Sequence, residues 1–228
     1  MKGLCVIPAR GGSKRIPRKN IRMFNGKPMI AWSIECAVES RIFHDIIVST
    51  DDEEIMNIAN QYGAATPFKR PKALSDDYAT TQDVIRHSIN EYSKEDAAID
   101  YVCCLYATSP LTFPQDILKA VEIMGKNPTA MVFPATTFDY PIQRALMINK
   151  DGWAEMIDKK QSLARSQDLG ETFHDAGQFY CAKISRWKSN TPILEKSKPL
   201  VIPRWRAQDI DTEEDWKRAE VIARTIED

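Results

Sequence analysis

The amino-terminal stretch Leu4-Cys5-Val6-Ile7-Pro8-Ala9-Arg10-Gly11-Gly12-Ser13-Lys14-Arg15 joins a short apolar run to a basic segment. The apolar run predicts a buried strand, and Lys or Arg recurs through Arg22 without an acidic residue before Glu35. Gly11 and Gly12 let the backbone adopt positive φ and approach a ligand closely. Successive amide N–H groups in such a loop form an anion-binding concavity, over which cationic side chains can close. We predict a polyanion site at a strand end; a solvated basic turn is the alternative.

Short apolar runs alternate with helical patterns along most of the chain. The apolar runs predict strands over 4–7, 46–49, 64–68, 101–106, 130–135, 177–182 and 200–203. The helical patterns predict helices over 28–40, 51–62, 79–95 and 114–124, and from Thr212 onward. Gly125 is expected to end the fourth helix, and Thr212–Asp215 fits a capping box. Strands that alternate with helices predict an α/β fold with a mostly parallel, Rossmann-like sheet between two layers of helices.

The length of 228 residues fits one domain, and we predict a single domain over residues 1–228. Residues 136–175 interrupt the α/β pattern, because they lack a helical period and contain the turn Asp151-Gly152. They are also rich in polar and aromatic side chains. We expect this segment to form a strand-and-loop extension that projects from the sheet.

The composition narrows the classes of protein. The net charge is −1, so the basic segment is local and the chain lacks the overall charge of a nucleic-acid binder. No stretch approaches the length of a transmembrane helix, and the first apolar run is too short for a secretory signal. The five cysteines are a scattered, odd set without metal-ligand spacing. We therefore expect no membrane association and a location in the reducing cytoplasm.

Polar residues follow other predicted strands. Ligands of open parallel sheets bind beyond the carboxyl ends of the strands. Thr108 and Ser109 follow the fourth predicted strand, where they either donate to a substrate or start a turn. Asp209 and Asp211 lie on the same side of an extended segment, because side chains alternate there. Two such carboxylates suit Mg²⁺; a pair of helix-capping acids is the alternative.

Other motifs are less specific. The basic segment lacks the Gly-Lys-Ser/Thr ending of a P-loop and the three-glycine spacing of a dinucleotide fingerprint, which disfavours a P-loop hydrolase and a dehydrogenase. The polar connection from Arg70 to Thr81 is either part of a site or an ordinary N-cap loop. His174 and Asp175 form either a catalytic dyad or a structural, ligand-orienting pair.

The motifs together resemble a known family. Residues 7–20, 48–51, 70–71, 75–79, 108–111 and 209–212 are similar to the cytidylyltransferases that activate acidic nine-carbon sugars. The similarity covers nearly the whole chain, in order, and implies a nucleotidyltransferase fold. Residues 103–108, 140–145, 165–169 and 174–177 resemble the members that activate pseudaminic acid. Members that act on N-acylneuraminates, such as sialic or legionaminic acid, are the alternative.

The resemblance implies a role for each motif. It implies that the catalytic residues are Arg10, Lys14, Lys19 and Asp211. It implies that the nucleotide-binding residues are Arg10, Gly11, Gly12, Ser13, Lys14, Lys19, Asn20, Arg70, Ala79 and Thr108. It implies that the Mg²⁺ ligands are Asp209 and Asp211. The candidates for the sugar side are Tyr106, Gln143, Arg144, Arg165, His174 and Tyr180. A bidentate guanidinium at Arg144 or Arg165 matches a sugar-acid carboxylate, with a surface or interface arginine as the alternative.

The resemblance also implies a reaction and an assembly. The anomeric hydroxyl of a nine-carbon sugar acid would attack the α-phosphorus of CTP in line, giving the CMP-sugar and pyrophosphate. The extension (residues 136–175) would join two subunits of a homodimer and complete the neighbour's sugar pocket. Two other classes stay open. One is a glycosyltransferase, whose Asp-X-Asp motif Asp209–Asp211 imitates. The other is a non-catalytic module whose basic segment binds nucleic acid or a lipid headgroup.

Overall fold

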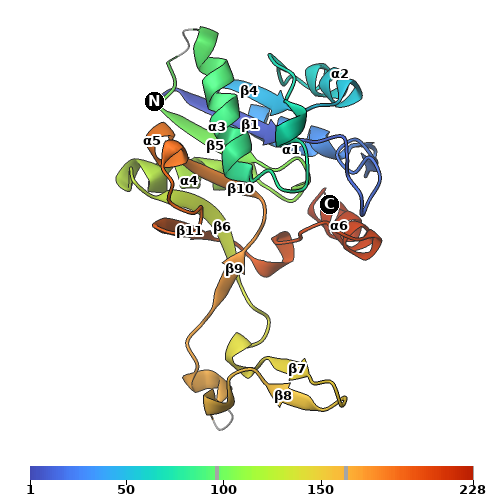
Figure 1. Ribbon diagram of the computed structural model, residues 1–228, viewed down its shortest axis with the longest axis vertical. Helices are drawn as coiled ribbons and strands as arrows, with labels where there is room; N and C mark the ends of the chain where they lie inside the picture. The colour runs from blue at the N-terminus through green and yellow to red at the C-terminus, as the bar shows by residue number, and fades with distance from the viewer. Residues whose placement is uncertain (96–97, 162–163, 228) are drawn as a thin grey trace.

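Strand β1 (Gly3–Pro8) lies inside a seven-stranded sheet and is buried up to its last residue. The protein is described by a computed structural model over residues 1–95, 98–161 and 164–227 (Figure 1). The other strands of the sheet are β4 (Phe43–Ser49), β5 (Tyr101–Leu105), β6 (Met131–Thr137), β9 (Phe173–Asp175), β10 (Phe179–Lys183) and β11 (Ser197–Val201). Their order is β11-β6-β10-β5-β1-β4, with β9 paired to β6.

The sheet is mixed but mostly parallel. β1 pairs in parallel with β4 and β5, and β6 pairs in parallel with β11. β10 runs antiparallel to both of its neighbours, β5 and β6. The ends of β1, β4 and β5 therefore meet at one edge of the sheet, which is where the predicted ligand site was placed. The predicted α/β fold is confirmed.

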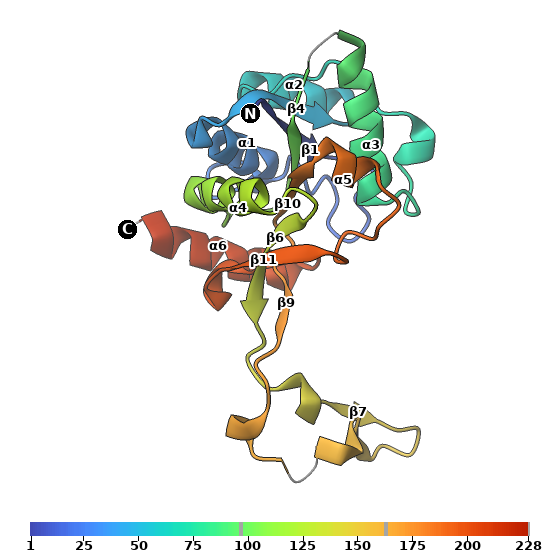
Figure 2. The same cartoon turned by 90° about the vertical axis from the view of Figure 1, so that its left-hand side faces the viewer.

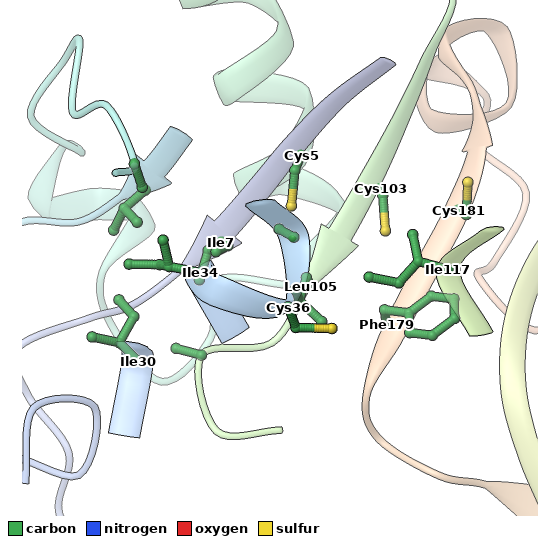
Figure 3. Packing of buried hydrophobic residues seen from close by; sticks show 14 of the residues in the cluster. Cys5, Ile7, Ile30, Ile34, Cys36, Cys103, Leu105, Ile117, Phe179 and Cys181 are labelled. Atoms are coloured by element: carbon green, nitrogen blue, oxygen red, sulfur yellow. The ribbon is translucent and has the colours of Figure 1, made fainter. Parts of the chain in front are cut away.

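Helices cover both faces of the sheet, as Figure 2 shows with the sheet seen on edge. The helices are α1 (Met29–Ser40), α2 (Glu53–Gln61), α3 (Thr81–Tyr92), α4 (Pro114–Lys126), α5 (Ile184–Lys188) and α6 (Glu213–Glu227). Side chains alternate along β1 and feed two cores. Cys5 and Ile7 pack with residues of α1, α2 and α4 (Figure 3), whereas Leu4 and Val6 pack with residues of α3 and α5.

Helix α6 packs at the edge of the sheet against the segment that follows β1. Its Trp216 is fully buried and meets the ring of Phe24 edge-on at 5.5 Å, while the guanidinium of Arg22 lies 4.5 Å from the Trp216 ring centre. The predicted capping box forms, because the Thr212 hydroxyl accepts from the Asp215 amide and Asp215 accepts from the Thr212 amide. This packing brings the residues before α6 beside the basic segment.

The extension begins and ends in the paired strands β6 and β9, which form its stem. Beyond the stem, β7 (Leu146–Ile148) and β8 (Ala154–Met156) form a separate two-stranded sheet that projects from the body (Figure 1). The 3₁₀ helices of the chain are η1 (Lys72–Leu74), η2 (Ser93–Glu95), η3 (Ile142–Arg144), η4 (Lys159–Gln161), η5 (Ser166–Asp168) and η6 (Arg204–Arg206). β2 (Met23–Phe24) and β3 (Lys27–Pro28) form a short hairpin. The predicted projection of residues 136–175 is therefore present.

Two local predictions are wrong. Residues 64–68 form no strand, because only the isolated bridges of Ala65 and Lys69 reach β4 and its end, and Pro67 between them has no N–H to donate. Gly125 does not end α4, which continues to Lys126 and is closed by Asn127, whose amide donates to the carbonyl of Met124. Over the described residues, no helix is both long and apolar enough to cross a membrane.

Candidate active site

The basic loop (residues 9–20) leaves β1 and is held by side chains on both sides. Asn20 donates its amide to the carbonyl oxygen of Arg10 at 2.9 Å, and the Gly11 amide donates to Asp51 at 3.0 Å. Gly11 and Gly12 do not have positive φ, so that prediction is wrong; Arg18 is the left-handed residue, with φ 56°. The loop is shaped by these hydrogen bonds rather than by left-handed glycines. Close approach is what requires the glycine at Gly11, where a Cβ would lie 2.6 Å from an oxygen of Asp52.

Four cations of the basic loop, Arg10, Lys14, Arg15 and Lys19, border one open cavity, here called the basic cavity. Its volume is about 340 Å³. The other residues that line it are Pro8, Ser13, Asn20 and Asp77. Positive charge gathered at the end of a central strand attracts an anion of high charge.

Asp77 places a carboxylate on two of these cations. It accepts from Arg10 at 2.8 Å and from Lys14 at 2.5 Å. The bonds from Lys14 and then Arg10 lower the pKa of Asp77, which is exposed to solvent. Sequence reasoning missed this residue, because the segment before α3 has the composition of an N-cap loop. Thr80 does cap α3, accepting from the Asp83 amide.

A second cavity, of about 240 Å³, adjoins the first. Both cavities are lined by Pro8, Arg10, Asn20 and Asp77. The second is lined in addition by Arg70, Leu74, Asp76, Ala79, Thr81, Val84, Tyr106, Ala107 and Thr108. The structure therefore brings together the predicted nucleotide-side residues Arg70, Ala79 and Thr108, which are far apart in the sequence.

Arg70 is the buried cation of the second cavity, with 5% of its surface exposed. Its Nε and one Nη have no hydrogen-bond partner, and the carboxylate of Asp51 lies 4.0 Å away. Burial lowers the pKa of the guanidinium. Arg70 therefore places a buried positive charge in the wall of this cavity, which favours a ligand that carries negative charge or acceptor atoms.

Asp209 and Asp211 flank Ile210, which is fully buried in the α6 core. Alternation therefore turns both carboxylates away from that core. Asp211 accepts from Arg15 at 2.7 Å and lies 3.4 Å from the ammonium of Lys19, which also donates to the Ile210 carbonyl at 2.6 Å. Burial first, and the charge of Asp211 second, raise the pKa of Asp209. These two carboxylates thus lie beside the basic cavity.

The two carboxylates fit a cation that takes few protein ligands. In the part of the chain that the structure describes, no cluster of three His, Cys, Asp or Glu residues could hold a metal ion. Mg²⁺ is commonly bound through one or two carboxylates together with waters and substrate phosphate oxygens. Burial, and second the charge of Asp211, raise the pKa of Asp209, and a bound cation would favour its ionised form against both effects.

Two sugar-side candidates, Tyr106 and Tyr180, contact each other, whereas a third, His174, packs on the ring of Phe138 and lines another cavity. Tyr106 lines the second cavity, and its ring meets that of Tyr180 edge-on at 5.7 Å. The Tyr180 hydroxyl donates to Asp175. His174 is next to Asp175 and its Nδ1 lies 2.9 Å from the Asp175 carbonyl oxygen. The pair therefore has the structural, orienting arrangement rather than that of a side-chain dyad.

The other three sugar-side candidates lie away from Tyr106 and Tyr180 within one subunit. Gln143 and Arg144 belong to η3, and Arg165 precedes η5, all beyond the stem of the extension. Figure 1 shows these elements on the side of the molecule away from β1 and β5. Gln143 donates to the Gly170 carbonyl within the extension. Within one subunit the β6–β9 stem carries these three residues away from Tyr106 and Tyr180, and their assignment to the sugar side stays a prediction.

Comparison with solved structures supports the fold. CMP:2-keto-3-deoxy-manno-octonic acid synthetase in complex with CTP superposes with a TM-score of 0.71 at 17% identity, covering 99% of this chain and 100% of the other. At that identity the likeness concerns the fold alone.

Comparison of sequences gives closer relatives. A pseudaminic acid cytidylyltransferase of Campylobacter jejuni subsp. jejuni serotype O:2 is 48% identical over 224 residues, which cover 97% of this chain and 96% of that protein. A CMP-N,N'-diacetyllegionaminic acid synthase of Legionella pneumophila is 35% identical, with 97% and 96% of the two chains covered.

Fold, site and relatives together define a nucleotidyltransferase. The cytidylyltransferase family model matches residues 4–194, and the chain belongs to this family.

Proposed function

We propose that this protein joins CTP and pseudaminic acid, giving the CMP-sugar and pyrophosphate. The observation that carries the proposal is the junction of the two cavities. Four cations border one cavity, with the carboxylate of Asp211 paired to two of them, while the buried cation Arg70 lines the other. A triphosphate bound in the first would direct its nucleoside into the second through the shared Arg10 and Asn20. The 48% identity to a pseudaminic acid cytidylyltransferase supports the choice of sugar.

Both reactants are anions, so alignment and charge neutralisation are the main tasks of the protein. We assign Arg10, Lys14 and Lys19, with Ser13 and the Gly12 amide, to the triphosphate, whereas the Gly11 amide already donates to Asp51. The cations hold the α-phosphate and the leaving pyrophosphate while the anomeric hydroxyl of the sugar acid attacks the α-phosphorus in line. Their preorganisation supplies the electrostatic stabilisation that this transition state requires.

The nucleoside is assigned to the second cavity. Asn20, Arg70, Ala79 and Thr108 would border cytidine, with the Arg70 guanidinium as its buried donor. The guanidinium of Arg70 only donates, and a nucleobase in this cavity would lie beside it with acceptor atoms of its own.

Asp209 and Asp211 are assigned to Mg²⁺. When bound, Mg²⁺ supplies charge neutralisation at phosphate oxygens and a template for in-line displacement. Asp211 is paired with Arg15 and lies near Lys19. These two cations therefore hold the carboxylate at the rim of the basic cavity.

The assembly is proposed to be a homodimer in the cytoplasm. The extension exposes large apolar side chains, among them Tyr140 at 84%, Ile148 at 79% and Trp153 at 72%. Contiguous exposed apolar surface is typical of an interface. A second copy covering this surface would return Gln143, Arg144 and Arg165 to a sugar site. Light scattering should give twice the monomer mass, and a monomer would contradict the assembly.

One experiment tests the function. The protein is given CTP and Mg²⁺ with pseudaminic acid, N-acetylneuraminic acid, legionaminic acid or the eight-carbon acid Kdo, and pyrophosphate release is measured. Pseudaminic acid should give the highest kcat/KM. Preference for another of these acids would overturn the choice of sugar and leave the reaction standing. Release with none of them would overturn the reaction.

A further inference from the structure

Asp175 is the last residue of β9, the strand by which the extension returns to the body. Its two carboxylate oxygens have different partners. One accepts from the Gly177 amide at 2.8 Å, and the other accepts from the Tyr180 hydroxyl. The first bond restrains the carboxylate from within the turn that follows β9, where Gly177 has a left-handed backbone with φ 64°. Asp175 is therefore held rigidly against Tyr180.

Tyr180 lies between Asp175 and Tyr106, which lines the second cavity. Its ring is 7% exposed, is stacked on Phe133 at 6.2 Å and meets the ring of Tyr106 at 5.7 Å. A ring packed on two sides can vary its hydroxyl position little unless its neighbours move. Tyr106 is fixed from its other side as well, because its hydroxyl lies 2.9 Å from that of Thr81 at the start of α3. Tyr106 is therefore clamped between α3 and β10.

The hydrogen-bond direction at Tyr180 follows from its partner. A carboxylate only accepts, so the single hydroxyl proton of Tyr180 is used by Asp175. The oxygen of Tyr180 then offers only lone pairs to any other neighbour. Burial raises the pKa of both tyrosines, that of Tyr106 to about 12, so both hydroxyls stay protonated at neutral pH.

We propose that Asp175 is a positioning residue for sugar recognition: through Tyr180 it holds Tyr106 in place in the wall of the second cavity. The proposal rests on the proposed function, since Tyr106 is assigned to the sugar side. The order of contacts is Asp175, Tyr180, Tyr106, with Thr81 closing the far end. Loss of the Asp175 carboxylate leaves the Tyr180 hydroxyl buried without its acceptor, and the two tyrosine rings lose their fixed positions.

The test is a double-mutant cycle with steady-state kinetics. Asp175→Ala and Tyr180→Phe are each expected to raise KM for pseudaminic acid about tenfold, with a smaller rise in KM for CTP, because Tyr106 also borders the cavity assigned to the nucleoside. The double variant should be no worse than the worse single variant, because the two residues act as a unit. Asp175→Asn keeps one acceptor oxygen and should fall between wild type and Asp175→Ala. Asp151→Ala, in an exposed turn of the extension, is the matched control and should behave as wild type.

The outcomes separate this inference from the proposed function. Unchanged kinetics in Asp175→Ala, equal rises in both KM values, or additive effects in the double variant would each overturn the positioning role. So would a loss of thermal stability that accounts for the loss of activity. A wild-type protein that releases no pyrophosphate with any of the four sugar acids would overturn the proposed function, and the inference with it.

Discussion

Gly11 passes so close to Asp52 that a Cβ on the glycine would lie 2.6 Å from an Asp52 oxygen. Asp52 cannot simply move away, because it accepts from the Ile55 amide as the N-cap of α2 and is also paired with Arg18. The basic loop and the start of α2 are therefore one packed unit. This contact, rather than backbone conformation, explains the glycine.

Gly11→Ala is expected to destabilise the protein by about 1–2 kcal/mol, the range for losing an N-cap, and to raise KM for CTP. Gly12→Ala is the matched control, because nothing lies within 4 Å of a Cβ built there. Urea unfolding and CTP kinetics of both variants make the comparison. Equal behaviour of the two variants would show that the Gly11–Asp52 contact is unimportant.

Asp77 occupies Arg10 and Lys14, two cations that we assign to the triphosphate. Before CTP binds these cations, the carboxylate must give way. Asp77→Asn should therefore lower KM for CTP by about two- to tenfold, a range that follows from two exposed ion pairs. Initial-rate kinetics at fixed sugar concentration measures it.

The control for that variant is Asp76→Asn, which removes the same charge one residue away. The Asp76 carboxylate accepts from the amides of Tyr78 and Ala79, and an asparagine oxygen can keep these bonds. KM for CTP should change less in this variant than in Asp77→Asn. A higher KM for CTP in Asp77→Asn would show instead that Asp77 orients the cations for the substrate.

Sequence patterns could predict the features that are determined by residues adjacent in the chain. The strand at Leu4–Ile7 followed by a basic loop, and Asp209 and Asp211 on either side of Ile210, are both local alternation patterns. They were read correctly because burial of one side chain determines where the adjacent ones point. The capping box at Thr212 is local as well.

Contacts between residues that are far apart in the sequence could not be predicted. Asp77 meets Arg10 and Lys14 more than sixty positions away, and no pattern within residues 75–81 signals that pairing. The sugar-side residues Gln143 and Arg144 were grouped with Tyr106 by resemblance, but the length of the stem separates them in one subunit. The prediction of a strand over 64–68 failed for a local reason instead, because Pro67 has no N–H to donate to β4.

Substitutions of Asp211 and Arg10 test their assignment as catalytic residues. Asp211→Asn and Arg10→Ala are each expected to lower kcat by about 10²–10³-fold, the usual cost of one preorganised electrostatic contact. Pyrophosphate release measures this effect, and thermal unfolding checks that both variants fold. Glu213→Gln is the control: Glu213 follows Asp211 by two residues and is paired with Arg22, and its loss should leave activity intact. Near-normal turnover in folded Asp211→Asn would remove that residue from the machinery.

The Arg18–Asp52 pair gives a prediction about pH. The hydrogen bond from Arg18 is the main cause that lowers the pKa of Asp52 below its ordinary value. Stability from this charge is therefore fully present above the unfolded-state pKa, about 3.9, and is lost as pH falls through the lower folded-state pKa. Asp52→Asn keeps an N-cap acceptor but removes the charge. It should cost about 1 kcal/mol at pH 7, since the pair is partly exposed.

Chemical denaturation of wild type and Asp52→Asn from pH 7 to pH 3 measures the difference. The gap in unfolding free energy should be constant down to about pH 4 and then close, because Asp52 of the unfolded chain binds a proton there while folded Asp52 is still ionised. Asp52→Ala provides the contrast, because it also removes the cap and should keep a deficit of about 1 kcal/mol at low pH. A gap between wild type and Asp52→Asn that does not change with pH would show that the charge of Asp52 contributes nothing to stability.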